Sequence, residues 1–243
     1  MPPKWSPRKG ITTILIVLVI VIGFVVWNLI SNQPTKPVKE PKDGWATILP
    51  QAQHWKLRSS DTFETENEFW QNGSQRTSLA DRKLQIVDGK YRVEVLARYP
   101  LTAHLGPGGA STSTNFYIAV DGSLVGTGQG VYGLAFHAAR IPSSQEYYGF
   151  FIIGDAYSFQ VVKDDNSRMI IDWTETPAIQ FGQMNHVAVV GAGSHYVFFI
   201  NDQYVDEASD DELGPGGAGV LISMDKSDDT LVLEFRVQRV IGP

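Results

Sequence analysis

The hydrophobic pattern divides the chain into one long apolar run followed by many short ones. Residues Ile11 to Ile30 form a run of twenty residues that only Thr12, Thr13, Gly23 and Asn28 interrupt. At a helical rise of about 1.5 Å per residue the run is roughly 30 Å long, the thickness of the hydrocarbon core of a bilayer. It therefore predicts a transmembrane helix.

A cleaved signal peptide is the alternative interpretation of this run. The apolar region of a signal peptide usually has about 7–15 residues and ends at a small-residue cleavage site. This run is longer, and Val25-Val26-Trp27-Asn28 offers no such site. Trp5 and Trp27 lie near its two ends, where indole rings favour the membrane interface. The pattern thus favours an uncleaved anchor with both tryptophans at the interface.

The flanking segments predict the orientation in a cell membrane. Residues 1–10 contain three basic and no acidic side chains, so the positive-inside rule keeps this tail in the cytoplasm. Residues 31–44 contain three prolines and predict a semi-rigid extended linker. The remaining domain, residues 45–243, is then expected to be extracytoplasmic behind a single-pass anchor.

From Trp45 onward the pattern predicts strands. Short apolar stretches recur between turn signals every 8–12 residues or so, which is typical of a β-sandwich or barrel. Hairpins are expected around Asp88-Gly89, around Gly154-Asp155 and around a turn at Gly191–Ser194. The last strand, Leu231–Val240, alternates apolar and polar side chains, which predicts one buried and one solvated face.

Seven segments of this part of the chain follow a familiar order. They are Val87-Asp88-Gly89-Lys90-Tyr91-Arg92-Val93, Val131–Phe136, Tyr147–Ile153, Ile171-Asp172-Trp173-Thr174, Asn185–Val187, Phe199-Ile200-Asn201-Asp202 and Leu233–Val237. Together they resemble the concanavalin A-like lectin/glucanase superfamily, in particular its laminin-G-like domains related to 3-keto-disaccharide hydrolases, over about residues 60–240. The resemblance implies an all-β, two-sheet antiparallel jelly-roll sandwich. The matching residues are mostly turn and core positions, so they indicate a fold rather than an activity.

The catalytic run of the glucanases is incomplete in this chain. Those enzymes carry Glu-x-Asp-x-x-Glu, and the closest segment here is Ile171-Asp172-Trp173-Thr174-Glu175, with Ile170 at the first glutamate position. Asp172 and Glu175 are three residues apart, so on a regular strand they face opposite sides. A paired-carboxylate mechanism needs both on one side. We therefore expect no enzymatic activity.

No cofactor is predicted. The chain has no cysteine, and its five histidines show no metal-ligand spacing. The acidic turns at 164–166 and 225–229 resemble calcium loops in composition, but solvated turns explain them better, so the sequence allows calcium without indicating it. The soluble part has 17 basic and 26 acidic side chains, which argues against nucleic acid as a partner.

Aromatic side chains are the best remaining binding candidates. Sugar-binding faces combine an exposed ring with polar groups at its edge. Trp173 beside Asp172 is the first candidate for a glycan or a partner, followed by Trp70, Tyr148 and Tyr132; the alternative is that such rings fill the core.

The sequence leads first to a non-catalytic, membrane-anchored interaction module that acts as an accessory subunit of a membrane protein complex. Its partners would be the lipid bilayer and other membrane subunits. A surface glycan-binding module is the alternative, and a glycoside-acting enzyme is the second alternative.

Overall fold

The computed structural model describes residues 39–41, 47–66, 70–106, 112–126, 130–139, 146–164, 166–224 and 229–243. All of them belong to one compact unit, Val38–Pro243. The predicted anchor at Ile11–Ile30, with Trp5 and Trp27, lies outside these residues, as does most of the predicted linker. No helix within the described ranges is long and apolar enough to span a membrane.

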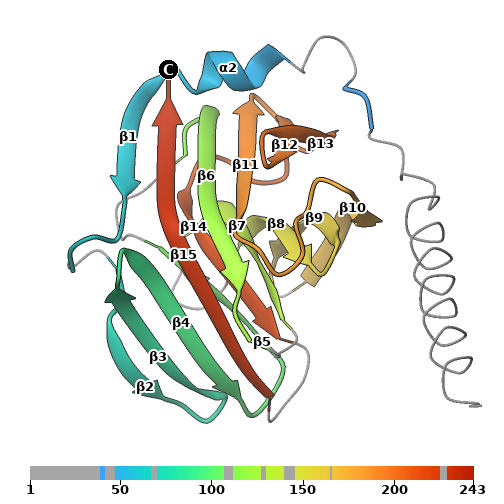
Figure 1. Ribbon diagram of the computed structural model, residues 1–243. Helices are drawn as coiled ribbons and strands as arrows, with labels where there is room; N and C mark the ends of the chain where they lie inside the picture. The colour runs from blue at the N-terminus through green and yellow to red at the C-terminus, as the bar shows by residue number, and fades with distance from the viewer. Residues whose placement is uncertain are drawn as a thin grey trace, which may run out of the picture. The chain divides into compact units, whose positions relative to one another are not determined.

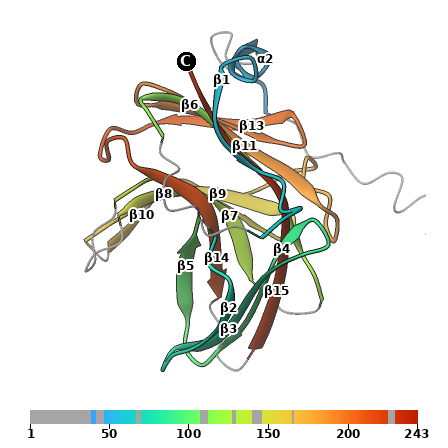
Figure 2. The ribbon, with the colours of Figure 1, turned by 90° about the vertical axis from the view of Figure 1, so that its left-hand side faces the viewer.

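Two antiparallel sheets make up the domain (Figure 1), which confirms the predicted two-sheet sandwich. The larger sheet has the spatial order β13 (Gln203–Ser209), β12 (His195–Ile200), β11 (Asn185–Ala192), β6 (Asn115–Leu124), β15 (Asp229–Gly242), β4 (Lys90–Ala97), β3 (Ala80–Val87) and β2 (Gly73–Arg76), with β1 (Lys56–Asp61) paired to β15. The smaller sheet has the order β10 (Asn166–Glu175), β9 (Ala156–Lys163), β8 (Tyr147–Ile153), β7 (Val131–Ala138), β14 (Gly217–Met224) and β5 (Leu101–Leu105). Figure 2 shows β6, β11 and β13 in one layer and β7, β8 and β9 in the other.

The predicted hairpins are confirmed, with turns that use left-handed backbone conformations. Asp88 and Gly89 join β3 to β4 with φ of 53° and 66°, the type I′ geometry that matches strand twist. Asn201 and Asp202 turn β12 into β13 in the same region of φ. The turn expected at Gly191–Ser194 is shorter than predicted, because β11 continues to Ala192 and pairs with His195.

Aromatic rings from both sheets form the core between them. Phe136, Phe150 and Phe159 project inward from the smaller sheet, and Tyr196 and Phe198 project inward from β12. The ring centroids of Phe150 and Phe198 are 4.6 Å apart, and those of Phe159 and Phe198 are 4.7 Å apart. Since burying one such ring contributes about 1.5–3 kcal/mol, this layer is a major source of sandwich stability.

The outer face of the larger sheet is partly covered by a short helix. This helix, α2 (Ile48–Ala52), buries Leu49 and Ala52 against a second apolar cluster that includes Tyr117 and Phe199. Beside it, Lys39 Nζ lies 2.6 Å from a carboxylate oxygen of the buried Asp206 on β13. The segment 39–41, predicted as part of an extended linker, is therefore held against the domain at this point.

We expect Gly133→Ala to destabilise the domain by about 3 kcal/mol or more. A Cβ at position 133 would lie 1.9 Å from the carbonyl oxygen of Phe150, so β7 and β8 would have to separate. Urea unfolding measures the effect. Gly214→Ala is the matched control, because nothing lies within 4 Å of a Cβ built there. Equal stability of the two variants would contradict the close pairing of β7 with β8.

Candidate functional site

A hollow runs across the outer face of the smaller sheet. It has a volume of about 530 Å³, and all six strands contribute to it. We call it the outer trough; its lining residues are Thr102, Val131, Tyr147, Phe151, Gln160, Val162, Ser167, Met169, Trp173 and Ser223.

Strand alternation produces the apolar floor of the outer trough. On β8, Tyr148 and Phe150 point into the core, so Tyr147 and Phe151 must point outward. Gly149 lies between them, and a Cβ there would meet the ring of Phe151 at 2.2 Å. The absence of a side chain at this glycine thus lets the Phe151 ring lie close to the sheet.

Polar groups are set into and around this floor. Gln160 lies on β9, next to the edge strand β10, and pairs with Gly149 on one side and Met169 on the other. At the opposite end, the hydroxyl oxygens of Thr102 and Ser223 are 2.9 Å apart. The outer trough therefore offers an amide and hydroxyl groups beside aromatic rings.

The first sequence candidate, Trp173, lines the outer trough. It lies on the edge strand β10, and 46% of its surface is exposed. Asp172 is exposed next to it in the chain, in a stretch where the pairing of β10 with β9 is irregular. The strand continues past Asp172 to Glu175. A binding role for either residue stays a prediction.

The other three candidates lie in the core, which corrects their selection as exposed rings. Trp70 is 2% exposed and packs with Phe63 and Tyr91, at centroid distances of 4.9 and 4.8 Å. Tyr148 is fully buried, and its hydroxyl donates to Asp210 at 2.6 Å. Tyr132 is 5% exposed and accepts a hydrogen bond from Asn185. Apolar packing in the core favours burial of these rings, and hydrogen bonds satisfy the hydroxyl groups of Tyr148 and Tyr132.

Sequence reasoning missed Phe151 and Gln160 as site residues and gave Tyr147 no priority. The run Tyr147-Tyr148-Gly149-Phe150-Phe151 is aromatic on both sides of the strand. Its pattern therefore does not show which side faces the core. The glycine at the centre was the available signal, because a glycine within a strand often marks a close approach.

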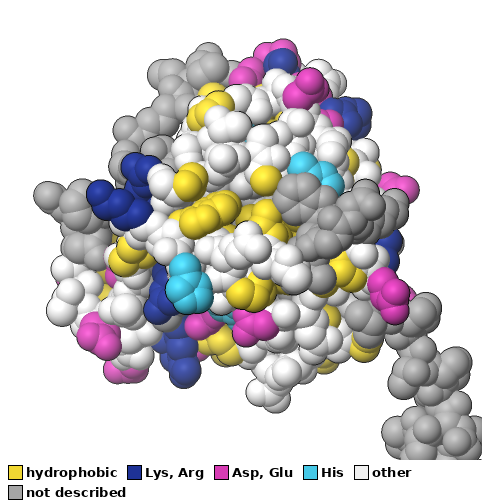
Figure 3. All heavy atoms as spheres, turned by 90° about the horizontal axis from the view of Figure 1, so that it is seen from above, with side chains coloured by type: hydrophobic (Ala, Val, Ile, Leu, Met, Phe, Trp, Pro, Cys, Tyr) yellow, Lys and Arg dark blue, Asp and Glu magenta, His cyan; other side chains and the backbone are white. Residues whose placement is uncertain are grey.

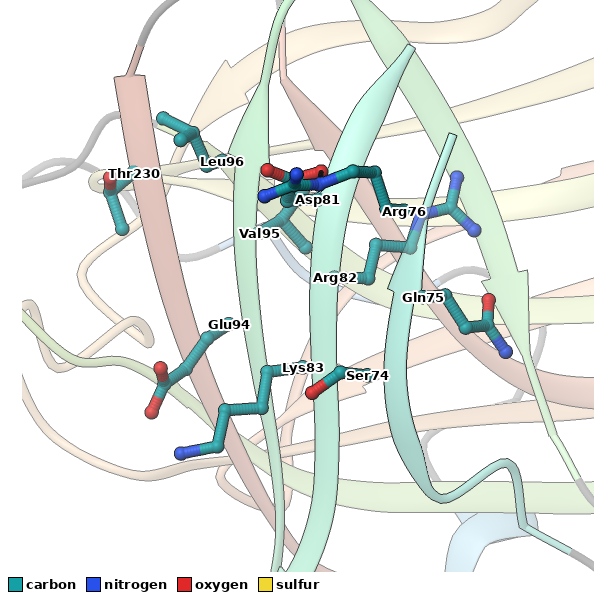
Figure 4. A pocket seen from close by; sticks show the side chains of 10 residues that line it. All are labelled: Ser74, Gln75, Arg76, Asp81, Arg82, Lys83, Glu94, Val95, Leu96 and Thr230. Atoms are coloured by element: carbon teal, nitrogen blue, oxygen red, sulfur yellow. Dashed lines mark hydrogen bonds and ion pairs between the residues drawn. The ribbon is translucent and has the colours of Figure 1, made fainter. Parts of the chain in front are cut away.

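A second hollow, of about 370 Å³, lies on the larger sheet at β2, β3, β4 and β15 (Figure 4). Here Arg76 reaches toward Asp81 at 3.1 Å, while Gln75 and Arg82 point away from this pair. The hydrogen bond from Arg98, together with the charge of Arg76, holds the pKa of Asp81 below its ordinary value. Because the protein already pairs this carboxylate with cations, the hollow is a weaker candidate for a ligand site.

Charged side chains elsewhere do not form a large basic patch on the face seen in Figure 3, where acidic and basic groups are interspersed. Within the described ranges, no group of three or more His, Asp or Glu side chains could hold a metal ion. The acidic turn at 225–228 lies outside those ranges.

Solved structures of glycanases share this two-sheet fold at low sequence identity. A prokaryotic β-1,3-1,4-glucanase (lichenase) from a mouse hindgut metagenome matches with a TM-score of 0.54 and 10% identity, over 76% of this chain and 99% of that one. The laminarinase catalytic domain of Thermotoga maritima MSB8 matches with a TM-score of 0.54 and 8% identity, over 78% and 98%. The carbohydrate-binding module CBM66 of Bacillus subtilis matches with a TM-score of 0.48 and 17% identity, over 76% and 97%.

No family model and no curated protein sequence matches the chain. At these identities the structural likeness shows a shared concanavalin A-like fold, and function must be argued from the site.

We expect Tyr147→Phe to reduce the loss of stability at alkaline pH. Burial raises the pKa of Tyr147 to about 12. The unfolded chain ionises this tyrosine near pH 10, so its contribution to stability is complete below pH 10 and is lost as pH rises through about 12. Urea unfolding should show a decline between pH 10 and 12 that is smaller in the variant by up to roughly 2 kcal/mol.

The range from about pH 7 to 9 is the internal control for this titration, because Tyr147 ionises there in neither the folded nor the unfolded protein. A decline of the same size in both proteins would contradict burial of the hydroxyl in the floor.

Proposed function

We propose that this chain is a non-catalytic, membrane-anchored glycan-binding module whose ligand lies in the outer trough. The observation that carries the proposal is the combination of aromatic and neutral polar side chains that line the outer trough. The buried Tyr147 and Phe151 form an apolar floor, Gln160 supplies an amide, and Trp173 stands exposed at the edge.

These groups match the two kinds of surface on a sugar. The C–H faces of a pyranose pack against aromatic rings, while its hydroxyl groups need neutral donors and acceptors at the ring edge. The outer trough crosses six strands, which at about 4.8 Å per step amounts to roughly 24 Å. That length suits a chain of several sugars rather than a single one.

Fold-level analogy adds support. Two structures with the same fold and TM-scores of 0.54 are a lichenase and a laminarinase, both of which act on glycans. This favours glycan binding over the accessory-subunit role that the sequence suggested first, since no described feature identifies a protein partner. The analogy concerns the fold and leaves the particular sugar open.

The lining of the outer trough supports binding without hydrolysis. Glycoside hydrolysis by the common mechanisms needs two carboxyl groups on either side of the scissile bond. None of the ten described lining residues is an aspartate or a glutamate. The anchored state rests on the apolar run Ile11–Ile30 and the basic residues before it, which would hold the domain at the extracytoplasmic surface.

Trp173→Ala should weaken glycan binding at least tenfold while leaving the fold intact. Truncation of an exposed aromatic contact that carries a ligand commonly costs more than about 1.4 kcal/mol. A glycan array followed by calorimetry on the full-length protein in lipid nanodiscs measures the change.

Phe181→Ala is the matched control for this substitution. Phe181 is also an exposed ring, with 74% of its surface accessible, but it does not line the outer trough. Equal effects of the two substitutions would refute the site, and absence of any glycan ligand for the unmodified protein would refute the function.

A further inference from the structure

We propose that the outer trough selects uncharged glycans and rejects chains that carry uronate, sialate or sulfate groups. This inference rests on the proposed function and adds the chemical class of the ligand.

The described lining of the outer trough contains no ionised side chain. Its polar groups are all neutral: the amide of Gln160, the indole N–H of Trp173, and the hydroxyls of Tyr147, Ser167, Thr102 and Ser223. The hollow on the larger sheet has a different character, because Arg76, Asp81, Arg82, Lys83 and Glu94 make up half of its ten lining residues. The two hollows of one domain thus differ sharply in the charge of their described lining residues.

An anionic sugar would lose bound water in the outer trough without forming an ion pair with a cationic side chain of the described lining. Transfer of an ionised carboxylate to an apolar surface is strongly unfavourable unless an opposite charge compensates it. The floor offers it the rings of Phe151 and Tyr147, their apolar neighbours and the neutral amide of Gln160, and the described lining supplies no cation. The net charge of the protein, −6, adds a weak repulsion.

A neutral sugar meets suitable partners in the same place. The side-chain amide of Gln160 makes no hydrogen bond to another described residue, so its two N–H donors and its carbonyl acceptor are available to hydroxyl groups. The hydroxyl groups of Thr102 and Ser223 are hydrogen-bonded to each other, and either one can be the donor. The pair can therefore present a donor or an acceptor to a ligand. Binding of this kind contains no ion pair and should respond little to salt.

The test compares matched ligands on the full-length protein in nanodiscs of zwitterionic lipid. Glucan, mannan and galactan hexasaccharides are each paired with the same chain oxidised at C6 to the uronic acid, and calorimetry is run at about 50 and 500 mM NaCl. We expect a neutral chain to bind at least tenfold more tightly than its oxidised partner, with less than about a twofold change in Kd between the two salt concentrations.

The outcomes separate this inference from the proposed function. Equal or tighter binding of the oxidised chains would overturn the selectivity and leave glycan binding in place. Failure of every chain, neutral and oxidised, together with an empty glycan array, would overturn both.

A charge-introducing variant tests whether the outer trough itself sets the selectivity. Gln160→Lys places a cation in the floor and should improve binding of oxidised chains at least fivefold at low salt, with the gain lost at high salt. Gln85→Lys, on β3 of the other sheet, is the control and should leave the ratio unchanged. An unchanged ratio in Gln160→Lys, or the same gain in both variants, would overturn the inference.

Discussion

Ring packing between the two sheets is the interaction on which the rest of this domain depends. Phe150 and Phe159 from the smaller sheet meet Phe198 from β12 at centroid distances below 5 Å. These contacts fix which side of each strand faces inward, since side chains alternate along a strand. Because Phe150 lies in the core, Tyr147 and Phe151 must lie on the outer face. The packing that stabilises the sandwich therefore also forms the floor of the outer trough.

The outer trough depends equally on residues that have little or no side chain. Gly133 allows β7 and β8 to pair closely, and Gly149 leaves the space in which the Phe151 ring lies against the sheet. Buried rings on the core side and small residues on the outer side therefore act together: the first hold the sheet in place, and the second leave a hollow above it. The hollow on the larger sheet, by contrast, is lined by ionised groups, among them Asp81, which pairs with Arg76 and Arg98. One domain thus combines a charged solvent face with an uncharged hollow.

The sequence by itself determined the fold class and much of the strand layout. Turn residues such as Asp88-Gly89 and Asn201-Asp202 define hairpins locally, because few other residues tolerate the positive φ of a type I′ turn. Alternation in the last strand likewise marks Leu231, Leu233 and Phe235 as buried, and all three are. The apolar run Ile11–Ile30 and the missing glutamate before Asp172 are also properties of the linear sequence.

Only the tertiary structure decided which aromatic side chains belong to the core and which to the outer trough. The sequence offered Trp173 first and then Trp70, Tyr148 and Tyr132 as exposed rings, yet only Trp173 is exposed and the other three are buried. The physical reason is that a strand such as β8 is apolar on both sides, so its pattern carries no information about direction. The partner sheet supplies that information through packing. Contacts between strands distant in sequence, β5 with β14 and β14 with β7, then bring Thr102 and Ser223 to the same hollow as Gln160 and Trp173.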